Sequence, residues 1–67
     1  MSDSARDLLR RLGEAEGHAL PLTKRNRGAA NELGGLGYVL IIHKRKGADV
    51  CLTRLGIDRM AVERTSN

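Results

Sequence analysis

The sequence predicts a small α+β domain whose elements follow the order helix, helix, strand, strand, helix. Apolar residues recur at helical spacing near both ends of the chain, which is typical of amphipathic helices. Between them, two segments rich in β-branched and apolar residues flank a polar turn with one glycine, the pattern of a β-hairpin. Because the 67 residues contain no repeat or linker, we expect a single domain over residues 1–67, with a tail that frays from about residue 65.

The first helix is expected over about residues 4–16. Its apolar face follows the i, i+3, i+4, i+7 spacing and consists of Ala5, Leu8, Leu9 and Leu12. Ser4 followed by Asp7 resembles a capping box, which would satisfy free backbone amides at the start of the helix. Gly17 is expected to end the helix as a left-handed cap.

The second helix is expected over about residues 24–34. It follows a segment, His18–Leu22, that holds the only proline of the chain and is predicted to form a turn. Thr23 offers a side-chain oxygen at the N-cap position of this helix. The expected apolar face is Ala29, Ala30 and Leu33, and the expected terminators are Gly34, Gly35 and Gly37.

Two antiparallel strands are expected at Tyr38–His43 and Val50–Thr53, joined by a polar turn over residues 44–49. Since side chains alternate across a strand, Cys51 would lie on the side opposite to its two neighbours. Gly56 is expected to break the second strand. Helical spacing then returns at Ile57, Met60 and Ala61.

Residues that carry catalytic or metal chemistry are sparse. Cys51 is the only cysteine, so no internal disulfide can form. One thiol with two distant histidines, His18 and His43, falls short of a four-ligand zinc site. We find neither a nucleophile with a base and an orienting group nor a carboxylate pair with a plausible pocket. The sequence therefore predicts a protein that is not an enzyme and has no cofactor and no metal.

The hydropathy pattern predicts a soluble cytoplasmic protein that does not bind membranes. The first twenty residues contain four acidic side chains and no continuous apolar stretch, unlike a secretory signal. The longest apolar run, Tyr38–Ile42, is far shorter than the roughly 20 residues that a membrane-spanning helix needs.

The positive charge of the chain is concentrated in its middle third. The net charge is +4, and residues 23–46 hold six basic side chains against one acidic side chain, Glu32. Such a concentration favours docking of a polyanion on this segment. Tyr38 is the sole aromatic residue, which argues against binding of single strands by base stacking.

The second half of the chain resembles a winged helix-turn-helix DNA-binding domain, as found in regulators of the multiple-antibiotic-resistance type and in small archaeal and phage regulators. The resemblance lies in AANELGGLGYV, a basic hairpin, and DVCLTRLGIDRM. The matching positions are Leu33, Gly37, Tyr38, Leu52, Thr53 and Gly56. It implies a small winged helix with a two-stranded wing, in which Gly37 permits the sharp turn into the wing and Gly56 lets the chain leave the sheet. The family has three helices before the wing, whereas this chain offers two.

The resemblance implies that the second helix is the recognition helix, with its N-terminal residues nearest the base edges. Arg25 or Arg27 would then bind guanine and Asn26 adenine, while Thr23 and the helix N-terminus would hold a phosphate. The complete set of candidate nucleic-acid-binding residues is Thr23, Lys24, Arg25, Asn26, Arg27, Lys44, Arg45 and Lys46. A short basic run is usually a solvated face. Two separate basic clusters that converge in one fold favour function instead.

The expected function is sequence-specific binding of double-stranded DNA by a transcriptional repressor or phage regulatory factor. We expect a homodimer that uses the first helix and a last helix bearing Ile57, Met60 and Val62. The alternative is a protein-interaction module of the phage inhibitor or adaptor type, which would present the same basic face to an acidic protein. A ribosome-associated or RNA-binding role is the third possibility.

Overall fold

The computed structural model describes residues 1–15 and 18–65, with side chains to residue 62. The elements are α1 (Asp3–Glu14), β1 (Leu20–Pro21), α2 (Arg27–Gly35), β2 (Val39–Lys44), β3 (Gly47–Leu52) and α3 (Arg54–Thr65). This composition confirms a small α+β domain. Two expectations, the cap at Gly17 and the end of the frayed tail at residues 66–67, lie outside the described residues.

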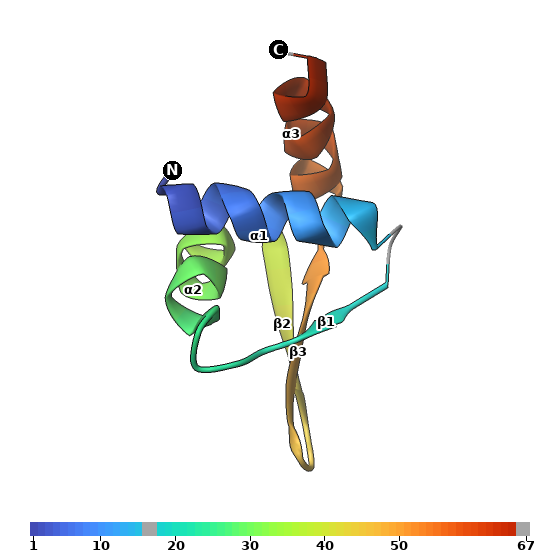
Figure 1. The fold of residues 1–67 in the computed structure, drawn as a ribbon. Helices are drawn as coiled ribbons and strands as arrows, with labels where there is room; N and C mark the ends of the chain where they lie inside the picture. Colours follow the sequence, from blue (N-terminus) through green and yellow to red (C-terminus); the bar gives the residue numbers. More distant parts are fainter. Residues whose placement is uncertain (16–17, 66–67) are drawn as a thin grey trace.

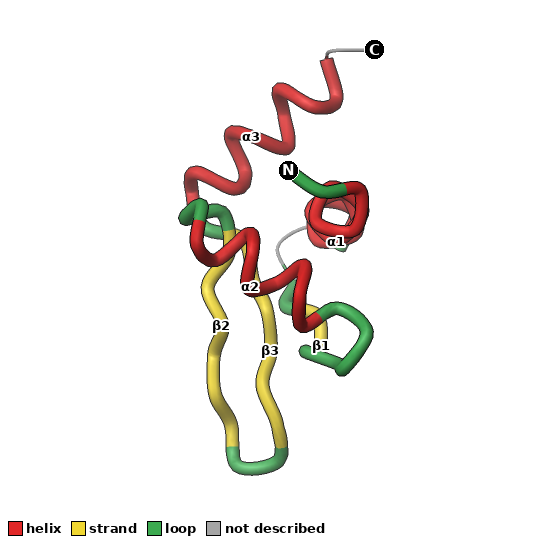
Figure 2. Tube along the Cα trace, turned by 90° about the vertical axis from the view of Figure 1, so that its left-hand side faces the viewer, coloured by secondary structure: helices red, strands yellow, loops and turns green. Residues whose placement is uncertain are grey.

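The three strands form one antiparallel sheet in the order β1-β3-β2. As Figure 1 shows, α1 crosses the upper part of the sheet and α2 lies beside it, while the β2–β3 hairpin extends away from both. Helix α3 leaves in the opposite direction from the tip of the hairpin (Figure 2). No helix in residues 1–15 and 18–65 is both long and apolar enough to span a membrane.

Helix α1 begins earlier than its sequence predicts. Ser2, in an extended backbone conformation, is the N-cap, and its hydroxyl oxygen accepts a hydrogen bond of 3.1 Å from the Ala5 N–H. Ser4 lies inside the helix, so the predicted capping box of Ser4 and Asp7 is wrong. The predicted apolar face is confirmed, because all four of its residues are buried.

Helix α2 begins later than predicted, at Arg27 instead of residue 24. Thr23 and Asn26 close the preceding turn reciprocally: the Thr23 N–H donates to Asn26 Oδ1 (2.7 Å), and the Asn26 N–H donates to Thr23 Oγ1 (3.2 Å). Thr23 therefore caps this turn and not the helix. Short polar side chains compete with the helix for backbone groups in this way, which is why the start shifts by three residues.

Strand β1 lies in the segment that was predicted to be only a turn. Leu20 pairs with Val50, and the Leu22 N–H donates to the Ala48 carbonyl (2.8 Å). Because hydrogen-bonded pairs alternate along an antiparallel ladder, the nitrogen of Pro21 faces away from β3. The absence of an N–H on proline therefore removes no hydrogen bond between β1 and β3. A strand of two residues is too short to leave a periodic pattern in the sequence.

The hairpin is longer and its turn tighter than predicted. Lys44 pairs with Gly47, so the turn is Arg45–Lys46 alone and not residues 44–49. Val50 is fully buried against the helices, whereas Cys51 is half-buried on the opposite side, as predicted. Its cross-strand neighbour Leu40 is 57% exposed on that outer side.

The junction of the hairpin with α3 depends on two glycines. Gly37 has φ +82°, which confirms the predicted left-handed turn into the hairpin. Gly56 has a different role from the predicted strand break, because it is buried inside α3 and a Cβ there would lie 1.9 Å from the Tyr38 carbonyl oxygen. Thr53 ends the sheet instead, and its hydroxyl accepts from the Gly56 N–H (3.1 Å) and donates to the Gly37 carbonyl (2.6 Å). Helix α3 thus begins at Arg54, before the expected Ile57.

The core lies between α1, α2 and the inner face of the sheet. Its buried residues are Ala5, Leu8, Leu9, Leu12, Ala29, Ala30, Leu33, Val39 and Val50. From α3, Met60 packs against this core, and its sulfur occupies the space that a Cβ on Gly13 of α1 would need. Met60 is therefore partly used within the chain, while Ile57 and Val62 of the expected dimer surface are exposed.

Candidate nucleic-acid interface

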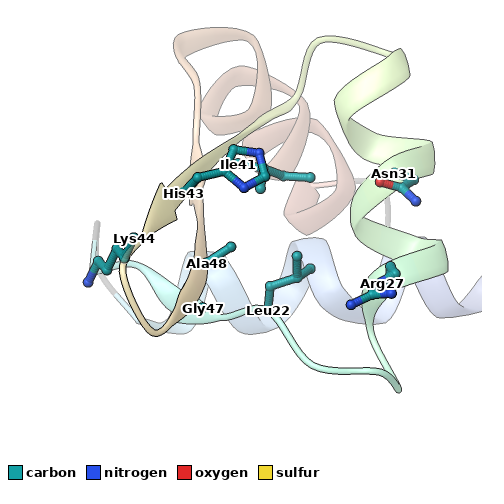
Figure 3. Close-up of a pocket in the computed structure, with 8 residues that line it drawn as sticks. All are labelled: Leu22, Arg27, Asn31, Ile41, His43, Lys44, Gly47 and Ala48. Atoms are coloured by element: carbon teal, nitrogen blue, oxygen red, sulfur yellow. The ribbon is translucent and has the colours of Figure 1, made fainter.

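A hollow of about 520 Å³ opens between α2 and the β2–β3 hairpin (Figure 3). The residues that line it are Leu22, Arg27, Asn31, Ile41, His43, Lys44, Gly47 and Ala48. Residues from α2, from the segment after β1 and from both strands of the hairpin meet here. The hollow therefore exists only in the folded chain.

Helix α2 contributes two polar side chains to the hollow. Arg27 and Asn31 are four residues apart, which places them one turn from each other on the same helix face. Figure 3 shows both on the side of α2 that faces the hairpin. The opposite side of α2 holds its buried residues Ala29, Ala30 and Leu33, so packing fixes the orientation of this polar face.

The hairpin contributes His43 and Lys44, of which His43 projects toward the hollow in Figure 3. Lys44 borders the hollow, but its ammonium points away and forms an ion pair with the Asp49 carboxylate. Among the lining residues there is no carboxylate. Arg27 is thus the lining residue that brings a positive charge to the hollow, beside the hydrogen-bonding groups of Asn31 and His43 and an apolar base, and this favours an anionic ligand.

The predicted residues divide into two groups. Arg27 and Lys44, one from each predicted basic cluster, border the same hollow. The other four basic residues are exposed but do not line it: Lys24 and Arg25 lie in the turn before α2, and Arg45 and Lys46 form the turn of the hairpin.

Asn26 is held within its turn and is not directed to a ligand. Its Oδ1 accepts from the Thr23 N–H, and its Nδ2 donates to the Pro21 carbonyl (3.1 Å). Paired bonds to adenine would require both atoms, so the predicted role of Asn26 conflicts with these contacts. Asn31 carries the same amide group and lines the hollow. The sequence could have indicated Asn31, because it lies four residues after Arg27, one helical turn away, but only if the helix is known to begin at Arg27.

Two glycines, Gly28 and Gly35, leave part of the exposed face of α2 without side chains. A Cβ placed on Gly28 or on Gly35 would meet no other atom within 4 Å. Both glycines therefore leave the helix backbone open to close approach. A broad, flat ligand can reach the helix here without displacing side chains.

Helix α2 also makes a polar contact with the start of α1. The Ser2 N–H donates to the Glu32 carboxylate at 2.7 Å. This bond, and a further one from the Ser2 hydroxyl, lowers the pKa of Glu32 below its ordinary value of 4.5. Glu32, the acidic residue of α2, is therefore bonded to the start of α1 and does not line the hollow.

No three His, Cys, Asp or Glu side chains are grouped as metal ligands among the side chains that the structure describes, in residues 1–15 and 18–62. No protein-family model, curated protein or solved structure matches this chain. The shape and charge of the hollow between α2 and the hairpin are therefore the basis for assigning a function.

Proposed function

We propose that this protein binds double-stranded DNA as a small winged helix-turn-helix regulatory factor. In this proposal α2 is the recognition helix in the major groove, and the β2–β3 hairpin is the wing along the adjacent backbone. The observation that carries it is the hollow between α2 and the hairpin, whose lining holds no carboxylate and includes Arg27, Asn31 and Lys44.

The order of elements supports this interpretation. A helix, α1, precedes a tight turn, a second helix and a hairpin, and the turn at Thr23–Asn26 stands where the resemblance implies a further helix. The positions that carry the resemblance act as scaffold: Leu33 is fully buried, and Thr53 joins both ends of the hairpin. We infer that the turn replaces the missing helix as the support for α2.

The chemistry of α2 suggests which bases it contacts. Arg27 suits the O6 and N7 acceptors of guanine, and Asn31 suits the N6 and N7 of adenine. Four residues of α-helix rise about 6 Å, which is close to two base-pair steps of about 3.4 Å. We therefore expect the two bases to lie about two steps apart. Lys24, Arg25 and the Arg45–Lys46 turn would contact phosphates, which position the protein without selecting sequence.

The biological role that fits such a factor is transcriptional repression or phage regulation in the cytoplasm. Binding to an operator excludes other proteins from the same DNA, and this needs no catalysis. The alternative roles, capture of an acidic protein or of structured RNA, use the same charges and are decided by the measurement below.

Selection of bound sequences from random duplexes, followed by fluorescence anisotropy, tests the proposal. Arg27→Ala and Asn31→Ala should each lose about 1–3 kcal/mol of discrimination at one base position. Arg45→Ala should weaken binding to all sequences about equally. Arg10→Ala is the matched control, because Arg10 is an exposed arginine on α1 away from the hollow.

Equal effects of Arg27→Ala and Arg10→Ala would contradict the proposal. Preference for an A-form RNA duplex would favour the RNA-binding alternative, because the deep major groove of RNA cannot admit α2. Indifference to both duplexes would favour the acidic protein partner.

A further inference from the structure

Strand β2 is an unprotected sheet edge. Within residues 1–15 and 18–65, the strand order β1-β3-β2 leaves one side of β2 without a neighbouring strand. Figure 2 shows β2 along the left margin of the hairpin, with no other described element beside it.

The pairing with β3 determines which groups are free. The Thr53 N–H donates to the Tyr38 carbonyl at 3.0 Å, so this is a hydrogen-bonded pair of the antiparallel ladder. Such pairs alternate with non-hydrogen-bonded ones. By the observed register, Leu40 and Ile42 therefore bond to β3. The N–H and C=O groups of Val39, Ile41 and His43 point to the free edge.

Residues 39–43 of β2 carry nothing that discourages another strand from joining them. Natural edges are usually blocked by proline, by charged residues or by bulges. Residues 39–43 contain no proline, no lysine, arginine or acid, and their register with β3 is uninterrupted. On the outer face of the sheet, Leu40 is 57% and Ile42 is 42% exposed. The edge thus offers unpaired backbone groups together with apolar side chains.

We propose that β2 pairs antiparallel with β2 of a second copy of this chain, about a two-fold axis at Ile41. The axis must pass through a residue whose N–H and C=O point to the free edge. Only then do the unpaired backbone groups of the two copies face each other. With Ile41 on the axis, it faces the partner's Ile41, and Val39 faces the partner's His43. Every outward N–H and C=O of the three residues is then paired, and on the outer face Leu40 lies against the partner's Ile42.

The length of β2 and the position of Lys44 select this register over the other two. An axis at His43 would leave only residues 42–44 shared by the two strands, since β2 ends at Lys44, and it would place Lys44 diagonal to the partner's Lys44, where like charges repel. An axis at Val39 would leave only Val39 shared by the two strands, since β2 begins there. With the axis at Ile41, the two basic turns lie at opposite ends of the dimer.

The two-fold axis of an antiparallel strand pair stands perpendicular to the sheet. Both copies of α2 would therefore lie on the same side of a continuous six-stranded sheet. If the proposed function holds, two hollows face one duplex and the preferred site is a palindrome. The dimer itself does not depend on DNA, and all three tests below are made without it.

Amide hydrogen exchange followed by NMR is the first test. In the dimer the amides of Val39, Ile41 and His43 should be protected, and their protection should fall on dilution. The amides of Leu40 and Ile42 are internal controls, since they bond to β3 in monomer and dimer alike. Fast exchange of Ile41 at every concentration would overturn the proposal.

Matched charge substitutions with measurement of mass by light scattering are the second test. Leu40→Lys with Ile42→Lys should halve the mass, to that of one chain of 7.3 kDa. Leu55→Lys with Ile57→Lys introduces the same charges at residues of α3 that are 59% and 53% exposed, and it should leave the dimer intact. Loss of the dimer in the second variant alone would show that the helices form the interface. Circular dichroism checks that both variants fold.

Cysteine cross-linking tests the register itself. Residues 40 and 42 of opposite copies form a non-hydrogen-bonded pair with Cα atoms about 4.5 Å apart, within the range of a disulfide. In a Cys51→Ser background, Leu40→Cys with Ile42→Cys should give a covalent dimer on oxidation. Leu40→Cys alone should not, because residue 40 does not face itself; a dimer from it would refute the register.

Discussion

Gly56 is the residue at which α3 touches the backbone of the hairpin. Its missing side chain lets the first turn of α3 rest on the Tyr38 carbonyl, and a Cβ would lie 1.9 Å from that oxygen. The obstacle is a backbone atom that the ladder already uses, so rotation of a side chain cannot relieve the clash. The sequence predicts a strand break at Gly56, whereas the structure shows a close contact with the Tyr38 carbonyl. A contact between residues far apart in the chain leaves no local pattern in the sequence.

Gly56→Ala should therefore destabilise the protein strongly. Overpacking typically costs about 1–3 kcal/mol, and we expect a loss near the upper end of that range. Urea unfolding followed by circular dichroism measures it. A loss below about 0.5 kcal/mol, the usual limit for surface substitutions, would contradict the contact.

Gly28→Ala should have the opposite effect on stability. Position 28 lies in the first turn of α2, and a Cβ there meets nothing within 4 Å. Alanine in place of glycine in a helix raises the free energy of unfolding by up to about 1 kcal/mol. If α2 enters a groove, the added methyl group should also weaken DNA binding. Greater stability with unchanged affinity would remove Gly28 from the proposed contact surface.

At the scale of elements, the start of α1 holds α2 through an acidic side chain. The Ser2 N–H and hydroxyl stabilise the ionised Glu32, so its pKa is lower in the folded chain than in the unfolded chain. Protons then bind the unfolded state more readily as the solution becomes acidic. The stability from this contact is complete above a pH of about 4.5 and is lost as the pH falls through the lower folded pKa.

Glu32→Gln should thus lower the thermal midpoint at neutral pH and reduce its further fall below pH 4.5. Thermal unfolding from pH 7 to pH 3 compares this variant with the wild type. Glu14→Gln, at the exposed end of α1, is the control for loss of one carboxylate. A profile of Glu32→Gln that parallels the wild type would rule out the proposed linkage.

The elements that sequence reasoning recovers are those with long apolar patterns. The buried face of α1 follows from helical periodicity, and the hairpin follows from two segments rich in β-branched and apolar residues, although the predicted second strand, Val50–Thr53, begins three residues after β3 does. The starts of helices and the short β1 do not, because they depend on single hydrogen bonds. At Thr23, competition between the side chain and the helix backbone decides where α2 begins.

At the scale of the whole molecule, the small core sets the limit of stability. At about 0.05–0.15 kcal/mol per residue, 67 residues give roughly 3–10 kcal/mol. Leu33 is fully buried where α2 meets α1 and the sheet. Leu33→Ala should cost about 2–5 kcal/mol, a large part of that total. Calorimetry should show a much lower midpoint, whereas Leu55→Ala, at an exposed leucine, should change it little.

Salt dependence reports on the charge of the whole binding surface. If about six phosphates are neutralised, log K should fall with log salt at a slope of about −5. Lys46→Ala should make the slope shallower by about one phosphate. A slope near zero for the wild type would exclude DNA binding through the basic residues.

The candidate site is only partly predictable from the sequence. The convergence of Arg27 with the basic end of the hairpin follows from the expected fold. Which hairpin side chains enter the hollow depends on the length of the turn, because a shift of one residue exchanges the two faces of a strand. The two-residue turn places His43 toward the hollow and the Lys44 ammonium away from it. The composition of the segment does not predict which of the two faces the hollow.

The bonds of Thr53 couple two parts of the chain. One hydroxyl bonds to Gly37, which precedes β2, and to Gly56 in the first turn of α3. The base of the hairpin and the start of α3 are therefore joined through a single side chain. Loss of that hydroxyl would release both contacts together.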